Sequence, residues 1–259
     1  KLNQNILQDT TYVDASAANG IYYYSTVSAV DSMLNESLND ITLRSRVVSL
    51  DQGILIVDET ADGDGSPMNP TDEEVDNFYG ELLAHFNKQQ YDMIEESQIG
   101  LADLGAFSTI IWHGNDFTDM NAPYDYKEEL IKYLNFGGNF LYTGYRPSKA
   151  FEKVVGQNGT FNSGDFIFDY LKIQETKGTI FALFNEAKMI TSGYNNIFVD
   201  SMKTLSSDDY HLKNIEMIKS SIDGTEIFSY GTNYDSTSQQ GYLKGKPVGV
   251  EYIGNDYKT

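Results

Sequence analysis

Short apolar runs alternate with amphipathic segments between residues 53 and 155, and this alternation restricts the possible folds more than any other feature. The runs at residues 54–58, 107–112 and 139–143 have the length of buried strands. Between the first two, residues 72–88 repeat apolar side chains at helical spacing. Strands that alternate with helices indicate βαβ units. We therefore expect an α/β fold with a parallel sheet flanked by helices and these three strands side by side.

Weaker patterns extend this prediction along the chain. A short strand is expected at residues 91–94, and helices at residues 126–136 and 148–155. From about residue 171 the pattern changes to short β-like pieces, which we interpret as extra strands of the same domain. They are residues 179–184, 188–190, 226–230 and 247–253.

Charge and composition exclude several classes of protein. The net charge is −20, from 38 acidic against 18 basic residues, which argues against binding to nucleic acid or to an anionic membrane. The absence of cysteine rules out thiol catalysis, disulfides and cysteine-based zinc sites. No apolar run approaches the ~18 residues of a membrane span. An acidic surface of this kind suits a secreted or cell-surface protein.

The amino-terminal part has a β-rich stretch over residues 21–30, preceded by the turn signal Asn19-Gly20. Its pattern is Gly20-x-x-Tyr23-x-x-x-Val27-x-Ala29-Val30-Asp31, followed by Asn35-Glu36-Ser37. This pattern resembles the last strands of a fibronectin type III domain. The resemblance implies that residues 1–45 are a partial β-sandwich and that Tyr23 is its tyrosine-corner residue. We expect residues 10–38 to be hairpin-like and to need cover from other structure.

We expect the remaining chain, residues 46–259, to be one α/β domain. Its residues 53–155 resemble the class I glutamine amidotransferase-like superfamily, in the form found inside secreted multidomain bacterial proteins, and its later strands resemble that superfamily less. The likeness is carried by the strand Ile54–Asp58, by Asp72-x-x-Val75-Asp76-x-Phe78-Tyr79, by Ile110-Ile111-Trp112-His113-Gly114 and by Leu134-x-x-Gly137-Gly138-x-Phe140-Leu141-x-Thr143-Gly144. It implies a flavodoxin-like parallel sheet. The partners that this context suggests are other domains of the same protein or cell-surface components.

Active members of that superfamily carry a cysteine on a sharp strand-to-helix turn, within a Gly-x-Cys-x-Gly pattern. The corresponding segment here spans residues 143–148 and offers Tyr145, whose phenol is a poor acyl nucleophile at neutral pH. Ser148 lacks the Gly-x-Ser-x-Gly elbow of serine hydrolases. We therefore expect no catalytic residues and a scaffold or ligand-binding module. The alternative is a hydrolase, or an accessory domain of one, that acts on a peptide or glycan.

Polar residues nevertheless follow the strands at the edge where open parallel sheets bind ligands. The candidate ligand-binding residues are Asp58, Glu59, His113, Asn115, Asp116, Tyr145 and Arg146. Two interpretations stay open at this point. These side chains either form a ligand site, which could be a vestigial active site, or they form a structural network of hydrogen bonds at the loop ends.

The loop after the first strand is a candidate calcium site. It reads Asp58-Glu-Thr-Ala-Asp62-Gly-Asp64-Gly65, and turns of this composition supply the oxygen ligands that Ca²⁺ requires. The spacing does not match an EF-hand. Asp58, Asp62 and Asp64 are therefore the candidate ligands, and a plain solvent-facing turn is the alternative.

Overall fold

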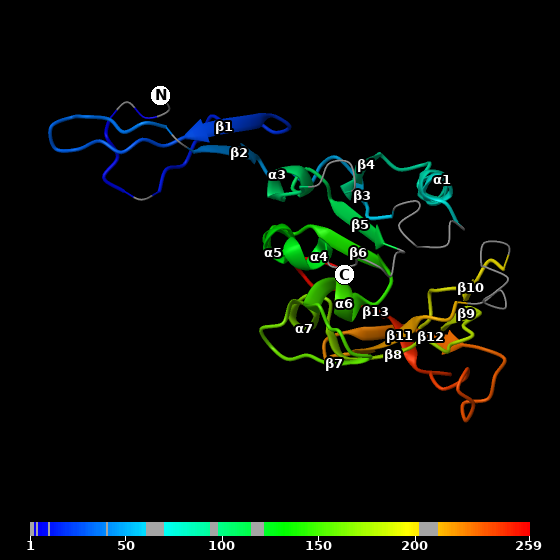
Figure 1. Cartoon of the computed structure of the whole chain (residues 1–259). Coiled ribbons are helices and arrows are strands. Elements are labelled where there is room, and N and C mark those ends of the chain that lie inside the picture. Colours follow the sequence, from blue (N-terminus) through cyan, green and yellow to red (C-terminus); the bar gives the residue numbers. More distant parts are fainter. Residues whose placement is uncertain are drawn as a thin grey trace.

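The computed structural model describes residues 3, 5–9, 11–39, 41–60, 70–93, 98–114, 122–201 and 212–259. Within this part, the chain is a mixed α/β structure with one four-stranded parallel sheet and three antiparallel sheets (Figure 1). None of the helices in these residues is long and apolar enough to span a bilayer.

The parallel sheet has the strand order β4-β3-β5-β6. Its strands are β3 (Ile54–Asp58), β4 (Lys88–Asp92), β5 (Thr109–Gly114) and β6 (Asn139–Gly144). All three pairings are parallel, which confirms that the three apolar strands lie side by side.

The fourth strand, β4, begins three residues before the predicted 91–94 segment. It lies at one edge of the sheet, where Gln89 and Gln90 are paired with β3 without apolar side chains. Apolar patterning could not reveal such a strand. The early start of β4 also shortens the preceding helix, α1 (Asp72–Leu82), which was expected to continue to residue 88. That helix begins as predicted, because Thr71 and Glu74 form a capping box.

The sheet buries its two faces differently. Leu55 and Val57 of β3 point into the main core, whereas Ile56 points to the other face, where it packs with Leu83 and Tyr79 after and within α1. The other helices in the described residues are α3 (Leu101–Leu104), α4 (Ala122–Asp125), α5 (Lys127–Asn135), α6 (Pro147–Glu152) and α7 (Phe166–Asp169). All of them except α4 contribute buried residues to the main core.

The turn from α5 into β6 depends on two glycines. Gly137 has a φ of +93°, in the left-handed region that favours glycine. A Cβ at Gly138 would lie 2.1 Å from the ring of Tyr133, which is fully buried. Since neither residue accepts a side chain freely, the sequence Gly137-Gly138 ends the helix as predicted.

The later part of the chain forms strands, as expected from its short β-like pieces, and these strands pair in antiparallel sheets. One sheet has the order β11-β8-β7 and the other β10-β9-β12-β13. The strands are β7 (Asn158–Thr160), β8 (Ile173–Thr179), β9 (Glu186–Met189), β10 (Ile197–Phe198), β11 (Ile215–Ser220), β12 (Thr225–Gly231) and β13 (Pro247–Glu251). The prediction of a strand at 179–184 is wrong, because β8 ends at Thr179 and the apolar Ile180 and Phe181 are exposed.

The amino-terminal residues form a two-stranded antiparallel hairpin that projects away from the parallel sheet (Figure 1). Its strands are β1 (Tyr22–Thr26) and β2 (Thr42–Arg46), so its second strand lies beyond the 10–38 segment that we expected to form it. Arg44 pairs with Asp103 of α3 at 2.5 Å, which holds β2 against the α/β part. The hydroxyl of Tyr23 accepts a hydrogen bond from the backbone N–H of Ala18.

Candidate functional site

The parallel register places two polar residues side by side at the carboxyl edge of the sheet. Asp58, the last residue of β3, is aligned with His113 of β5. Both are buried, with 1% of each residue exposed. Nδ1 of His113 lies 3.5 Å from Oδ1 of Asp58. Asp58 and His113 therefore lie side by side at the strand ends, where the sequence placed both of them.

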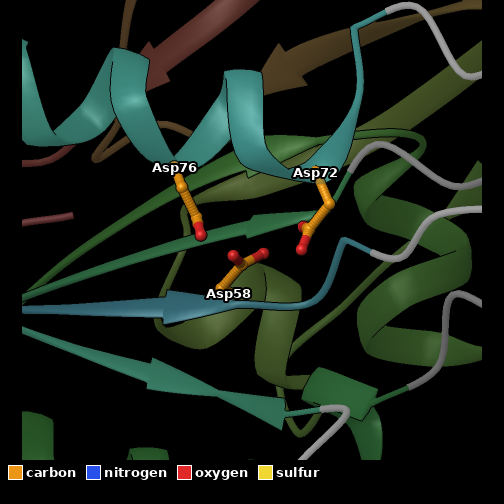
Figure 2. Close-up of side chains that lie close together, drawn as sticks. All are labelled: Asp58, Asp72 and Asp76. Carbon is orange, nitrogen blue, oxygen red and sulfur yellow. The ribbon is translucent and has the colours of Figure 1, made fainter.

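Helix α1 adds two further carboxylates to this position. Asp72 and Asp76 point from the helix toward Asp58, and one oxygen from each of the three lies within 4.8 Å of the others (Figure 2). Sequence reasoning missed both helical residues. Their spacing of four was the available signal, because residues i and i+4 share one face of a helix.

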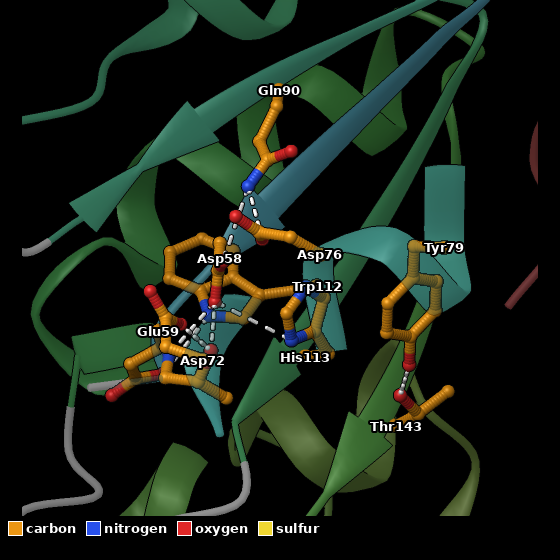
Figure 3. Close-up of polar contacts among 10 residues, drawn as sticks. Asp58, Glu59, Asp72, Asp76, Tyr79, Gln90, Trp112, His113 and Thr143 are labelled. Carbon is orange, nitrogen blue, oxygen red and sulfur yellow. Dashed lines mark hydrogen bonds and ion pairs between the residues drawn. The ribbon is translucent and has the colours of Figure 1, made fainter. Parts of the chain in front are cut away.

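Neutral side chains bridge these carboxylates (Figure 3). Oγ1 of Thr60 lies 2.6 Å from Oδ1 of Asp58 and 2.6 Å from Oδ1 of Asp72. Nε2 of Gln90 donates to Oδ2 of Asp58 at 3.2 Å and also to Oδ1 of Asp76. Gln90 has two amide protons for its two acceptors, whereas the Thr60 hydroxyl has one proton for two.

Burial changes the proton affinity of the cluster. Desolvation is the largest cause that raises the pKa of Asp58, and it raises the pKa of Asp76 from 3.8 to about 6, with the contact to Asp58 adding to the rise. Desolvation lowers the pKa of His113 to about 4, so its imidazole is neutral at physiological pH. The site therefore combines carboxylates that resist ionisation with a neutral imidazole.

An aromatic contact fixes the imidazole. The ring of Tyr79 stacks on that of His113, with centroids 4.3 Å apart and planes 12° apart. The Tyr79 hydroxyl in turn lies 2.6 Å from Oγ1 of Thr143 in β6. These contacts fix the orientation of the His113 ring, whose Nδ1 lies toward Asp58.

Glu59 and Tyr145 have surroundings different from those of Asp58. Oε2 of Glu59 accepts a hydrogen bond of 2.9 Å from the indole N–H of buried Trp112. Tyr145 follows β6 and is half-buried, with its backbone N–H donating to the carbonyl of Gly114.

Arg146 and Ser148 belong to a separate buried network. The guanidinium Nε of Arg146 lies 3.5 Å from Oε1 of Glu216 in β11. Glu216 also accepts hydrogen bonds from the backbone N–H of Ser148, at 3.0 Å, and from its Oγ, at 2.5 Å. Burial raises the pKa of Glu216, and the Ser148 and Arg146 contacts oppose that rise. This network joins α6 to an antiparallel sheet, and the structure uses Arg146 there.

Four of the predicted residues cannot be placed. Asn115 and Asp116 of the candidate ligand site, and Asp62 and Asp64 of the candidate calcium site, lie outside the described residues. Calcium binding by the acidic loop therefore stays a prediction. Of its proposed ligands, Asp58 lies beside Asp72 and Asp76.

Comparisons of the chain with protein-family models, with curated proteins and with solved structures gave no significant match.

The charge cluster predicts a pH-dependent effect of Asp76→Asn in metal-free buffer. Because folding raises the Asp76 pKa from 3.8 to about 6, the carboxyl favours the folded state below pH 3.8, and this contribution is lost as the pH rises through about 6. The side chain of the asparagine variant does not ionise, so its stability does not fall in this way as the pH rises. Above pH 6 it should be more stable than wild type by about 1 kcal/mol, a value reduced for solvent screening of the partly buried group.

Urea unfolding in the presence of a chelator, repeated between pH 4 and pH 7.5, measures this difference. Asp256→Asn, at an exposed carboxylate, is the matched control and should show no such gap. An Asp76→Asn variant that is less stable than wild type at pH 7.5 would contradict the raised pKa of Asp76.

Proposed function

We propose that this chain is a non-catalytic, ligand-binding module of a larger secreted or cell-surface protein, with its ligand site at the carboxyl edge of the parallel sheet. The proposal depends on the positions and hydrogen bonds of the hydroxyl groups that follow β6. Ser148 is fully buried and donates its hydroxyl to Glu216, and Tyr145 occupies the position of the missing cysteine. Neither arrangement provides an activated nucleophile beside His113.

The strand order supports a flavodoxin-like, amidotransferase-like fold for this part. Numbered along the chain from β3, the order β4-β3-β5-β6 reads 2-1-3-4, which begins the flavodoxin-like order. In such sheets ligands bind outside the carboxyl ends of the strands. Asp58 and His113 lie at that edge, so the polar site is located where ligands bind in sheets of this type.

The hydrolase alternative would require a nucleophile, a base and a group that orients the base. His113 and Asp58 could supply the last two, because Nδ1 and Oδ1 are 3.5 Å apart. The hydroxyl that contacts Asp58 belongs to Thr60, and it lies between two carboxylates. A hydroxyl held there faces negative charge, which opposes formation of an alkoxide nucleophile.

The hairpin of β1 and β2 supports membership of a multidomain protein. Its apolar side chains are largely exposed, including Tyr24 at 69% and Leu43 at 59%. The Tyr23 contact with Ala18 matches the tyrosine corner of a β-sandwich, whose hydroxyl bonds to the backbone a few residues upstream. We propose that the hairpin belongs to a fibronectin type III-like domain whose other strands, or a neighbouring domain, cover this apolar face.

A broad panel of glutaminase, esterase, amidase, peptidase and glycosidase substrates tests the absence of catalysis. We expect no turnover by the wild-type protein or by His113→Ala, with or without added divalent cations. The melting temperature of the variant serves as the control for folding. Turnover by the wild type that disappears in His113→Ala would overturn the proposal and favour the hydrolase alternative.

A further inference from the structure

We propose that Asp58, Asp72, Asp76 and His113 form a binding site for a divalent transition-metal ion. The inference deepens the proposed function and rests on it, because it names the ligand class of the same strand-end site. Two elements supply the three carboxylates, β3 and α1, and they direct an oxygen from each residue to one point (Figure 2). A third element, β5, supplies the imidazole.

The buried imidazole is the observation that points to a ligand beyond the carboxylates themselves. His113 is 1% exposed, and neither ring nitrogen makes a hydrogen bond to another described residue. Buried polar atoms normally find a partner, since leaving one without any costs about 1–3 kcal/mol. The ring directs Nδ1 toward Asp58, so a metal ion at this point would use its lone pair.

The separation of the two groups suits such an ion. Bonds of about 2.0–2.2 Å to a metal place neighbouring ligand atoms about 3.0–3.5 Å apart, depending on the coordination geometry. Nδ1 of His113 and Oδ1 of Asp58 are 3.5 Å apart, at the upper end of that range. The wider spread of the three carboxylates, up to 4.8 Å, requires a small inward rotation of the two α1 side chains on binding.

Charge balance also favours a cation. Neither Asp58 nor Asp76 forms an ion pair with a lysine or arginine within the described ranges. Instead, the single proton of the Thr60 hydroxyl lies between Asp58 and Asp72, at 2.6 Å from each. Only one of these short contacts can be a hydrogen bond from the threonine hydroxyl.

Gln90 has the position of an outer-shell partner. Its amide donates to both Asp58 and Asp76, which holds the two carboxylates in orientation. Hydrogen bonds of this kind commonly orient metal ligands. Asp72 and Asp76 keep partial exposure, which gives an ion a route to the buried Asp58.

The donor set selects among ions. Ca²⁺ and Mg²⁺ prefer oxygen ligands alone, whereas imidazole with carboxylates suits transition metals such as Mn²⁺ and Zn²⁺. We therefore expect Mn²⁺ to bind more tightly than Ca²⁺. This preference separates the site from the acidic loop of Asp58, Asp62 and Asp64, whose all-oxygen composition predicts calcium.

Calorimetry and thermal melting with Mn²⁺ test the inference on the chelator-treated full chain. At a hundredfold excess over Kd, Mn²⁺ should raise the melting temperature by about 5 °C or more. Asp72→Asn should weaken Mn²⁺ binding at least about tenfold, since it removes one charged ligand. If that variant does not fold, Asp76→Asn provides the same test, because it removes repulsion from the metal-free protein.

The double variant Asp62→Ala with Asp64→Ala is the control and should bind Mn²⁺ as the wild type does. The inference is wrong if Mn²⁺ does not bind, or if Ca²⁺ binds more tightly than Mn²⁺. It is also wrong if the double variant loses Mn²⁺ binding while Asp72→Asn retains it. Failure of Mn²⁺ to bind leaves the absence of catalysis intact. Mn²⁺-dependent hydrolysis would instead refute the non-catalytic proposal and leave the metal site standing.

Discussion

Replacing Glu216 with alanine is expected to destabilise the fold by about 3–5 kcal/mol, one of the largest effects of any single substitution in this chain. Its carboxylate is 1% exposed and lies 3.5 Å from Nε of Arg146. The same carboxylate accepts both hydrogen bonds from Ser148. Alanine would leave the buried guanidinium without its counter-ion and Ser148 without its acceptor, and unpaired buried charges are costly.

The midpoint of urea unfolding measures this loss. Glu175→Ala is the matched control, because that carboxylate is 45% exposed and lies 3.7 Å from Lys219 on the same antiparallel sheet. An exposed pair of this kind should cost less than about 1 kcal/mol. Equal losses in the two variants would refute the view that the Arg146–Glu216–Ser148 network joins α6 to the sheet.

Phe151→Ala is expected to cost about 3–5 kcal/mol as well, for a different reason. The ring is 0% exposed and lies at the centre of an aromatic group in the main core. Its centroid is 5.0 Å from that of Tyr142, 5.3 Å from Phe166 and 6.0 Å from Phe140. Removing the ring leaves a cavity between the parallel sheet and α7 that close-packed neighbours cannot fill.

Phe86→Ala provides a comparison with the same side chain removed at the surface, where the residue is 60% exposed. It should cost less than about 1 kcal/mol. Chemical unfolding of both variants measures the difference. A Phe151→Ala variant that unfolds at the same denaturant concentration as Phe86→Ala would contradict the assignment of the core.

The sequence predicted the parts of this fold that depend on local patterns. Buried strands such as β3 read as continuous apolar runs, and α1 begins with a capping box. It could not predict the start of β4, because an edge strand containing Gln89 and Gln90 carries no apolar signal. The strand-end rule likewise predicted that Asp58 and His113 would meet, since it follows from the parallel register.

Other parts of the site depend on contacts that no local pattern records. Arg146 faces Glu216, which lies 70 residues further along the chain on a different sheet. The spacing of Asp72 and Asp76 predicts that they share one face of a helix. Only the packing of α1 on the sheet turns that face toward Asp58. The residues at a strand end could therefore be predicted from the sequence, whereas the residues that contact them could be identified only from the structure.

Anomalous diffraction from crystals grown with Mn²⁺ tests for the metal site at the strand ends, because it locates the ion independently of any change in stability. We expect a single strong peak bounded by the carboxylates of Asp58, Asp72 and Asp76, at bonding distance from Nδ1 of His113. The peak should be absent from crystals of Asp72→Asn grown in the same way. A crystal of the wild-type protein with Mn²⁺ bound elsewhere and no peak among these four residues would contradict the account.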